Sequence, residues 1–400
     1  MSGVIYLDHN ATTPVDPAVL ESMLPFLREQ YGNPSSGHTA GKAAREAIEQ
    51  ARAEVAALLG AAADEVVFTS GATEALNAAI FSAVAAQPGR PMVLVSAVEH
   101  SAVVKAAEHA VGPGNVCRLR VTGDGRYDLG HLAEVLRENE GGFALACLMW
   151  ANNETGIIGG VREAAYILER HGVPLLCDMV QAIGKDPVDV NLPALRFAAL
   201  SGHKFHAPKG VGALWIRSGT PFSPHLHGGG QEGGRRGGTE NTAYIAGLGM
   251  AAQLARLRAA SPSELGRWSG ARDRFEARLT ALLPDVTIHG AAAPRVPNTT
   301  CVRLGGVPAE AMLVLLDEAG LCASSGSACR TGQAKPSPVL LAMGVGEAAG
   351  AETLRFSSCP GTTPEELDQA AAVIAAAGNR VRERLGNASR RGRVVRRSTA

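Results

Sequence analysis

Short apolar runs alternate with helical patterns through the middle of the chain, and this alternation constrains the fold most. Seven runs are expected to form buried strands, at 65–69, 91–96, 115–121, 143–150, 173–178, 197–201 and 212–217. Helical patterns lie between several of them, including 101–111, 128–139 and 161–171, and an Ala-rich helix at 38–59 precedes them. The pattern predicts an α/β domain with a mostly parallel, seven-stranded sheet and helices on both faces.

The remainder of the chain predicts a smaller α+β domain. A Gly-rich stretch at 227–238 interrupts the alternation, and a long helical region then runs from 241 to 283 with a break near Pro262. A strand, a helix, a Ser/Gly loop, a strand and a final helix are expected at 299–304, 308–320, 323–333, 352–356 and 363–386. We therefore expect a large domain at 15–260, a small domain formed by 1–14 and 261–386, and a disordered basic tail at 387–400.

Composition excludes several classes of protein. The 400 residues contain 38 Lys+Arg and 38 Asp+Glu, so the chain lacks the basic excess of a general nucleic-acid binder. Its apolar runs are far shorter than the roughly 20 residues that cross a bilayer. The first residues lack the layout of an export signal, so we expect a cytoplasmic protein. None of the seven cysteines forms a C-x-x-C pair, which argues against a disulfide scaffold and against a zinc ribbon.

Two motifs place charged side chains where predicted strands end. HKFHAPKG at 203–210 follows the strand 197–201, and LLCDMVQAIGK at 175–185 places Asp178 at the end of another. Ligands bind at this edge of an open α/β sheet. A lysine there, Lys204, has the properties of a Schiff-base amine, and an aspartate can keep a pyridine nitrogen protonated. The plainer alternatives are a surface lysine and a helix-capping aspartate.

Three more segments follow predicted strands. FTSGATEA at 68–75 opens a helix whose first turn suits one phosphate group, although an ordinary Ser/Thr cap has the same pattern. His100, in VEH, is placed to move protons near a flat ring, although a lone histidine is more often structural. Asn152 and Asn153, in MWANNETG, suit either a cofactor contact or a turn.

Two features of the predicted small domain complete the set. ASSGSACRTGQ at 323–333 places Cys329 in a small, polar loop, where a thiolate nucleophile is a better interpretation than a packing role. Arg355 lies within a strand, where it is expected to pair with a carboxylate, a substrate carboxylate being one candidate. Together, the phosphate site, ring-stacking base, pyridine-nitrogen acid, amine and arginine are what pyridoxal phosphate needs to act on an amino acid. The exposed cysteine is an addition to this set.

Taken together, these motifs resemble those of a known family, the cysteine desulfurases of the nitrogen-fixation-like subtype. These belong to the class V aminotransferase group of pyridoxal-phosphate enzymes. The likeness covers almost the whole chain, and its most specific motifs are SSGSAC and GHKFHAPKGVG. Other matching motifs are YLDHNATTP (6–14), GNPSS (32–36), TSGATEA, NNETG, D-x-x-Q, RRGGTEN (235–241) and LRFS (354–357). The resemblance implies the fold type I architecture of pyridoxal-phosphate transferases.

The resemblance also implies a role for each matching residue. Lys204 would be the Schiff-base lysine, His100 the ring-stacking proton carrier and Cys329 the sulfur acceptor. The coenzyme would be held by Asp178 at the pyridine nitrogen and by Gln181 at the phenolic oxygen. Asn153 and Arg355 would hold the substrate carboxylate. The phosphate would be bound by Ala72, Thr73, Ser201, His203 and, from the other subunit of a homodimer, Thr239.

The activity that this resemblance implies is conversion of L-cysteine to L-alanine, with a persulfide left on Cys329. The sulfur would pass to an iron–sulfur scaffold or other acceptor protein, and nitrogen fixation is one process it would serve. We expect no metal site beyond transient ligation of an iron–sulfur centre by that persulfide. Alternatives are a selenocysteine lyase, another class V enzyme such as a transaminase, and a non-catalytic sulfur-relay protein that uses Cys329 alone.

Overall fold

The computed structural model describes residues 3–325 and 337–397, with side chains described as far as residue 385. The chain divides into two compact units. The large unit comprises residues 11–153 and 157–265, and the small unit comprises residues 1–10, 154–156 and 266–400.

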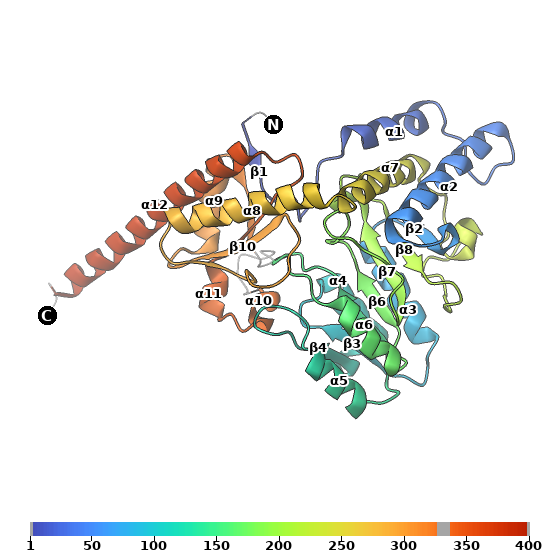
Figure 1. Cartoon of the computed structure of the whole chain (residues 1–400), viewed down its shortest axis with the longest axis horizontal. Coiled ribbons are helices and arrows are strands. Elements are labelled where there is room, and N and C mark those ends of the chain that lie inside the picture. The colour runs from blue at the N-terminus through green and yellow to red at the C-terminus, as the bar shows by residue number, and fades with distance from the viewer. Residues whose placement is uncertain (1–2, 326–336, 398–400) are drawn as a thin grey trace. The chain divides into compact units, whose positions relative to one another are not determined.

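A seven-stranded sheet forms the centre of the large unit (Figure 1). Its strand order is β2-β8-β7-β6-β5-β3-β4, in which β7, β6, β5, β3 and β4 are parallel neighbours and β8 runs antiparallel to both β7 and β2. The sheet confirms the predicted mostly parallel, seven-stranded architecture. The strands are β2 (Val66–Thr69), β3 (Met92–Ser96), β4 (Val116–Leu119), β5 (Phe143–Met149), β6 (Leu175–Asp178), β7 (Leu195–Ser201) and β8 (Gly212–Ile216).

Helices cover both faces of this sheet, as Figure 1 shows for α3 and α6. One face packs against α3 (Ala72–Ala85) and α4 (Ser101–Val111) through a cluster that includes Val95, Cys147, Leu176, Phe197 and Leu214. Side chains alternate between the two faces of a strand. The intervening residues therefore face the side on which α6 (Val161–Arg170) contacts β5 and β6, and α5 (Leu129–Glu138) packs against α6. Burial on both faces explains why these strands form continuous apolar runs in the sequence.

Further helices of the large unit pack beside the sheet. Here α2 (Thr39–Leu59) and α1 (Pro17–Arg28) lie against α7 (Thr242–Ala259). A Cβ on Gly249 of α7 would lie 2.6 Å from the Ala51 Cα of α2, so only glycine permits this close crossing. Short 3₁₀ segments complete the unit: η1 (Ala63–Glu65), η2 (Pro113–Asn115), η3 (Gly202–Lys204) and η4 (Gln231–Gly234).

A buried ion pair joins η4 to α2 and the sheet. The Arg52 Nη1 and Nη2 atoms donate to the Glu232 carboxylate at 2.6 and 2.9 Å, and the two side chains are only 9% and 1% exposed. The same carboxylate accepts the backbone N–H of Phe68 in β2 at 2.9 Å. Removal of one partner from such a pair leaves a buried charge without compensation.

We therefore expect Arg52→Met to lower the free energy of unfolding by about 3–5 kcal/mol. Arg118→Met is the matched control, because Arg118 forms a 3.5 Å ion pair with Glu108 between largely exposed side chains. That control should cost about 0–1 kcal/mol. Urea unfolding of the two variants measures both values, and equal losses would contradict a structural role for the buried pair.

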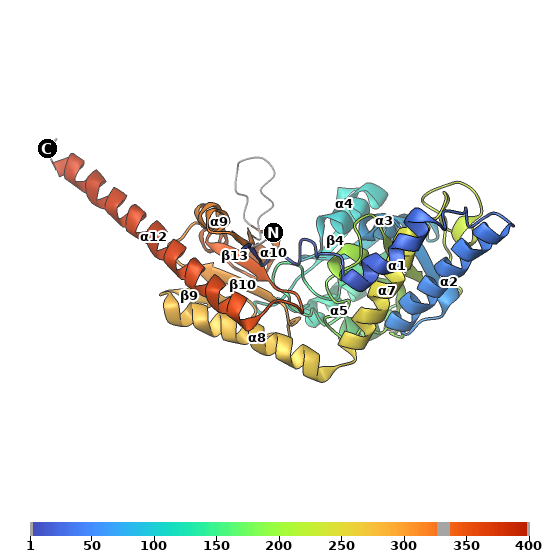
Figure 2. The same ribbon diagram turned by 90° about the horizontal axis from the view of Figure 1, so that it is seen from above.

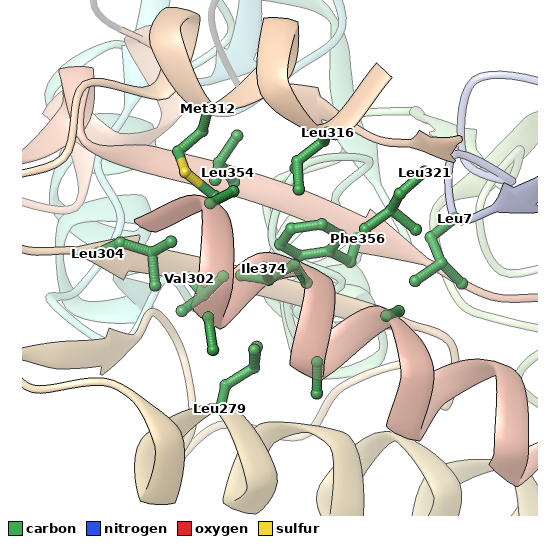
Figure 3. Packing of buried hydrophobic residues seen from close by; sticks show 14 of the residues in the cluster. Leu7, Leu279, Val302, Leu304, Met312, Leu316, Leu321, Leu354, Phe356 and Ile374 are labelled. Carbon is green, nitrogen blue, oxygen red and sulfur yellow. The ribbon is translucent and has the colours of Figure 1, made fainter. Parts of the chain in front are cut away.

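The small unit is built on an antiparallel sheet of order β12-β13-β10-β9, with a separate parallel pair of β1 and β11. Figure 3 shows Met312, Leu316, Ile374 and Leu279 from three helices converging on residues of β10 and β13. The strands are β1 (Ile5–Tyr6), β9 (Val286–Ile288), β10 (Thr299–Leu304), β11 (Leu321–Cys322), β12 (Ser324–Ser325) and β13 (Thr353–Ser357). The helices are α8 (Pro262–Leu282, which begins in the large unit), α9 (Ala309–Glu318), α10 (Pro338–Ala342), α11 (Glu347–Ala351) and α12 (Pro364–Arg397).

Two details differ from the sequence-based expectations. The sequence places the end of the last helix near residue 386, but the backbone of α12, visible at its full length in Figure 2, continues to Arg397. No proline interrupts this Ala- and Arg-containing stretch. Four cysteines lie in strand-like apolar runs of the sequence, which predict that they are small core residues. Of these, Cys147, Cys177 and Cys301 are buried, whereas Cys117 is half-buried because β4 lies at the edge of the sheet. In the described part of the chain, no helix has the length and apolarity to span a membrane.

Candidate active site

Neighbouring parallel strands of the large unit carry the predicted site residues at one edge of the sheet. Asp178 is the last residue of β6 and Ser201 is the last residue of β7. His100 follows β3 and Asn153 follows β5. Since the carboxyl ends of parallel strands share an edge, the topology gathers all four at the place where α/β sheets bind ligands.

Asp178 is a buried carboxyl group surrounded by cationic side chains. It is 6% exposed, and its Oδ1 atom accepts the backbone N–H of Val180 at 2.9 Å. Burial raises the pKa of Asp178, while the Val180 N–H and the positive charges of His100 and Lys204 oppose that shift. A carboxylate in this position gains from one more positive partner, such as a protonated ring nitrogen.

Lys204 lies at the end of η3, which follows β7 directly. Its Nζ atom donates to the carbonyl oxygen of Ala11 at 2.9 Å. The segment is also fixed by Thr13, whose backbone N–H and hydroxyl group both donate to the His203 carbonyl oxygen, at 2.9 and 3.0 Å. Lys204 is therefore held on a rigid turn within electrostatic reach of Asp178.

His100 has a structural role and still exposes its ring. It is the N-cap of α4, and its Nδ1 atom accepts the backbone N–H of Ala102 at 3.1 Å. In the neutral ring the proton is therefore on Nε2, the atom available for proton transfer. Asn152, just after β5, donates from Nδ2 to the Val98 carbonyl oxygen at 3.1 Å and so fixes the segment that leads to His100.

The first turn of α3 is a candidate anion site. Its N-cap is Gly71, which has no side chain to accept the backbone N–H groups of the first turn, so the expected alternative of a Ser/Thr cap is wrong here. The β2–β8–β7 register aligns Thr69 and Ser201 on either side of Gly212. A Cβ built on Gly71 would lie 3.6 Å from the Ser201 Oγ atom. The helix terminus and this hydroxyl group therefore line one cradle, which suits a phosphate group.

The absence of a side chain at Gly212 lets the strand lie close to Gly71 in this cradle. We therefore expect Gly212→Ala to weaken coenzyme binding at least about tenfold. A Cβ at this position would lie 2.5 Å from the Leu200 carbonyl oxygen and 2.7 Å from the Gly71 Cα, and both neighbours are backbone atoms. Gly114→Ala is the matched control, because its Cβ would meet nothing within 4 Å. Titration of the apoprotein with pyridoxal phosphate gives both affinities, and an unchanged affinity for Gly212→Ala would refute the cradle.

Two further predicted coenzyme contacts of the large unit are His203, which is partly buried, and Gln181, which is buried. Burial and the charges of Lys204 and Lys209 lower the pKa of His203 to about 4, so this ring is neutral near pH 7. Its Nδ1 atom lies 3.2 Å from the Thr12 Oγ1 atom. Gln181 is 4% exposed and follows β6, where its Oε1 atom accepts a hydrogen bond from Lys185 at 2.7 Å.

Four further site residues were predicted from the sequence. Thr239 is exposed, in the segment between η4 and α7. Asn153 is partly buried in the turn after β5. Arg355 lies in β13 of the small unit, buried, with its Nη2 atom 2.6 Å from the Asp8 Oδ1 atom. Cys329 lies outside the described residues.

A buried acid beside the site, Glu99, was not singled out by the sequence analysis. Its Oε1 atom accepts the Ser96 hydroxyl at 2.6 Å and the Met149 backbone N–H at 2.7 Å, while its Oε2 atom is buried with no hydrogen-bond partner among the described residues. Burial and the charge of Asp178 raise the pKa of Glu99 to about 8. Glu99 is therefore mostly protonated at neutral pH, and Asp178 does not face a second full negative charge. In the sequence, the only feature that points to Glu99 is its position one residue before His100.

These features fit pyridoxal 5'-phosphate. Its phosphate group matches the uncapped first turn of α3 beside Ser201, and its ring nitrogen matches the buried carboxyl group of Asp178. Its aldehyde requires an amine, and Lys204 supplies one within electrostatic reach of that carboxyl group.

Comparisons with known proteins identify relatives along almost the whole chain. Residues 5–370 match the family model described as aminotransferase class-V. A cysteine desulfurase of Trichormus azollae is 44% identical over 372 residues, which cover 93% of this chain and 92% of the relative. Among solved structures, a NifS-like protein superposes with a TM-score of 0.85 at 33% identity, covering 93% of this chain and 98% of its own. The structure of SspA in complex with cysteine has a TM-score of 0.77 at 31% identity, with coverages of 90% and 99%. The chain therefore belongs to the class V aminotransferase family of pyridoxal-5'-phosphate-dependent enzymes, within its cysteine desulfurase group.

Proposed function

We propose that this enzyme converts L-cysteine to L-alanine and transfers the sulfur to Cys329 as a persulfide. The observation that carries the proposal is the topology, which places His100 after β3, Asp178 at the end of β6 and Lys204 just after β7, at the carboxyl edge of one sheet. The relatives named as cysteine desulfurases, and the solved relative bound to cysteine, support the choice of substrate.

Coenzyme binding is assigned to residues of the large unit. Lys204 would hold the aldehyde carbon through Nζ, and Asp178 would keep the ring nitrogen protonated. The backbone N–H groups of Ala72 and Thr73 and the side chains of Ser201 and His203 would bind the phosphate group. Gln181 would donate to the phenolic oxygen, and His100 would stack on the ring. Bound in this way, pyridoxal phosphate supplies a ring that stabilises negative charge on a carbon next to an attached amine.

Proton and sulfur transfer are assigned to three side chains. Lys204 would take the substrate Cα proton at Nζ, and His100 would move protons through Nε2. The Cys329 thiolate attacks the substrate sulfur, so that the Cβ–S bond breaks as the new S–S bond forms. The two electrons of the broken bond stay with the carbon skeleton, which takes up protons and leaves as alanine. The overall change is L-cysteine plus one thiol to L-alanine plus one persulfide.

Substrate orientation is assigned to Asn153 and Arg355, which hold the carboxylate. Arg355 is buried and paired with Asp8, so its guanidinium group is already oriented before substrate binds. An arginine held in this way binds a planar carboxylate with little loss of side-chain entropy.

The wider context that we propose is a cytoplasmic homodimer that delivers sulfur to an iron–sulfur scaffold or a similar acceptor protein. Thr239 is exposed in the large unit, as it must be to reach the phosphate group of a second subunit. The persulfide on Cys329 would pass its outer sulfur to an acceptor thiol by exchange.

The test is a product analysis with L-cysteine as substrate. We expect stoichiometric alanine and, in the presence of a reductant, an equal amount of sulfide. Parallel reactions with selenocysteine and with a keto acid separate this activity from that of a lyase or a transaminase. Amino-group transfer to the keto acid with no alanine from cysteine would overturn the proposal.

A further inference from the structure

The turn after β6 carries a buried lysine that the proposed mechanism does not use. Lys185 is 6% exposed, and its Nζ atom donates to the Gln181 Oε1 atom at 2.7 Å. The two residues are four positions apart on a turn with helical hydrogen bonds, in which Asp186 N–H donates to the Ala182 carbonyl oxygen at 3.0 Å. This spacing places both side chains on one face. Burial of an ammonium group is costly, so its position calls for an explanation.

The turn holds Lys185 firmly. At its start, the Met179 backbone N–H donates to the Ala199 carbonyl oxygen of β7 at 3.0 Å. At its end, Asp186 accepts the Trp150 Nε1–H at 2.7 Å. In between, Gly184 adopts φ +71° and packs so closely on α7 that a Cβ would lie 3.1 Å from the Ala255 Cβ. A side chain on such a support keeps one position relative to its neighbours.

The chemistry of the contact fixes the orientation of the Gln181 amide. An ammonium group has three donors and no acceptor, so the amide atom that faces it must be the oxygen. The amide nitrogen therefore lies on the other side of the amide carbon, where it can only donate hydrogen bonds. The positive charge also polarises the amide, which strengthens its N–H groups as donors.

We propose that Lys185 is a positioning residue, which orients the Gln181 amide so that its nitrogen donates to the phenolic oxygen of pyridoxal phosphate. This inference rests on the proposed contact between Gln181 and that oxygen. Without Lys185 the amide could turn by 180° and present its own oxygen to the phenolate, which would replace an attraction by a repulsion.

The experiment is a double-mutant cycle on the apoprotein, titrated with pyridoxal phosphate. The variants are Lys185→Met, Gln181→Leu and the double variant. The readouts are the dissociation constant and the wavelength of the visible band of bound coenzyme, which responds to hydrogen bonding at the phenolic oxygen. We expect each single variant to weaken binding about tenfold and to shift the band, and the double variant to be no worse than either.

Two further variants separate this role from simple packing. Lys185→Arg retains a cationic donor, so it should restore most of the affinity and the wild-type band. Lys105→Met, which removes an exposed lysine from α4, should change neither readout. If Lys185→Met does not fold, Lys185→Leu takes its place in the cycle.

Each contrary outcome has a definite meaning. If Gln181→Leu alters both readouts but Lys185→Met alters neither, or if their effects add in full, the positioning role is wrong while the coenzyme contact of Gln181 stands. If Gln181→Leu alters neither readout, the contact and the inference both fail. Alanine formation from L-cysteine, measured on the wild type, tests the desulfurase proposal separately.

Discussion

Lys204→Ala is expected to abolish the visible absorption band of the bound coenzyme and to lower alanine formation from L-cysteine by at least about 10³-fold. The variant loses both the amine that holds the coenzyme and the group assigned to take the Cα proton, and positioned acid–base groups alone contribute about 10²–10⁴-fold. Absorbance of the purified protein and single-turnover alanine formation measure the two effects.

Lys209→Ala is the matched control for this change. Lys209 is an exposed lysine five residues further along the chain, and its charge reaches the same neighbour, His203. It should keep the absorption band and retain activity within about twofold, as is usual for surface substitutions. A Lys204→Ala protein that keeps the band and turns over cysteine would show that another amine holds the coenzyme and takes the Cα proton.

Cys329→Ser is expected to keep the coenzyme band but to lose sulfide release by at least about 10²-fold. A serine hydroxyl is a far weaker nucleophile than a thiolate and cannot carry a persulfide. One measurement is sulfide release with a reductant present. The other is the intact mass of the protein after one turnover, which should rise by one sulfur atom for the wild type but not for Cys329→Ser.

Cys359→Ser provides the control, because Cys359 is a partly exposed cysteine that lies outside the SSGSAC motif. It should behave as the wild type in both measurements. Undiminished sulfide release from Cys329→Ser would remove Cys329 from the mechanism, while loss of the coenzyme band would point to a structural role instead.

The sheet of the large unit could be predicted from the sequence because its strands are buried on both faces. The run at 143–150, for example, corresponds to β5 at Phe143–Met149, and the carboxyl ends of β6 and β7 bring Asp178 and Ser201 to one edge as expected. The two-residue strands β1, β11 and β12 of the small unit could not be predicted, because two residues show no periodicity.

Parts of the site also depend on tertiary packing that no local pattern reveals. The sequence indicates a phosphate-binding turn at 68–75, but not that Gly212 lies against Gly71 across the β2–β8 pair. Likewise, Glu99 and Lys185 are charged residues of ordinary appearance in the sequence. Only the fold shows that both are buried, one near Asp178 and the other against Gln181.

The most direct test of the central claim identifies the amine that holds the coenzyme. Purified wild-type enzyme, reduced with borohydride and digested, should carry its pyridoxyl group on the peptide that contains Lys204. A label on the peptide that contains Lys185, on another lysine, or on none would contradict the assignment of this edge of the sheet as the catalytic centre.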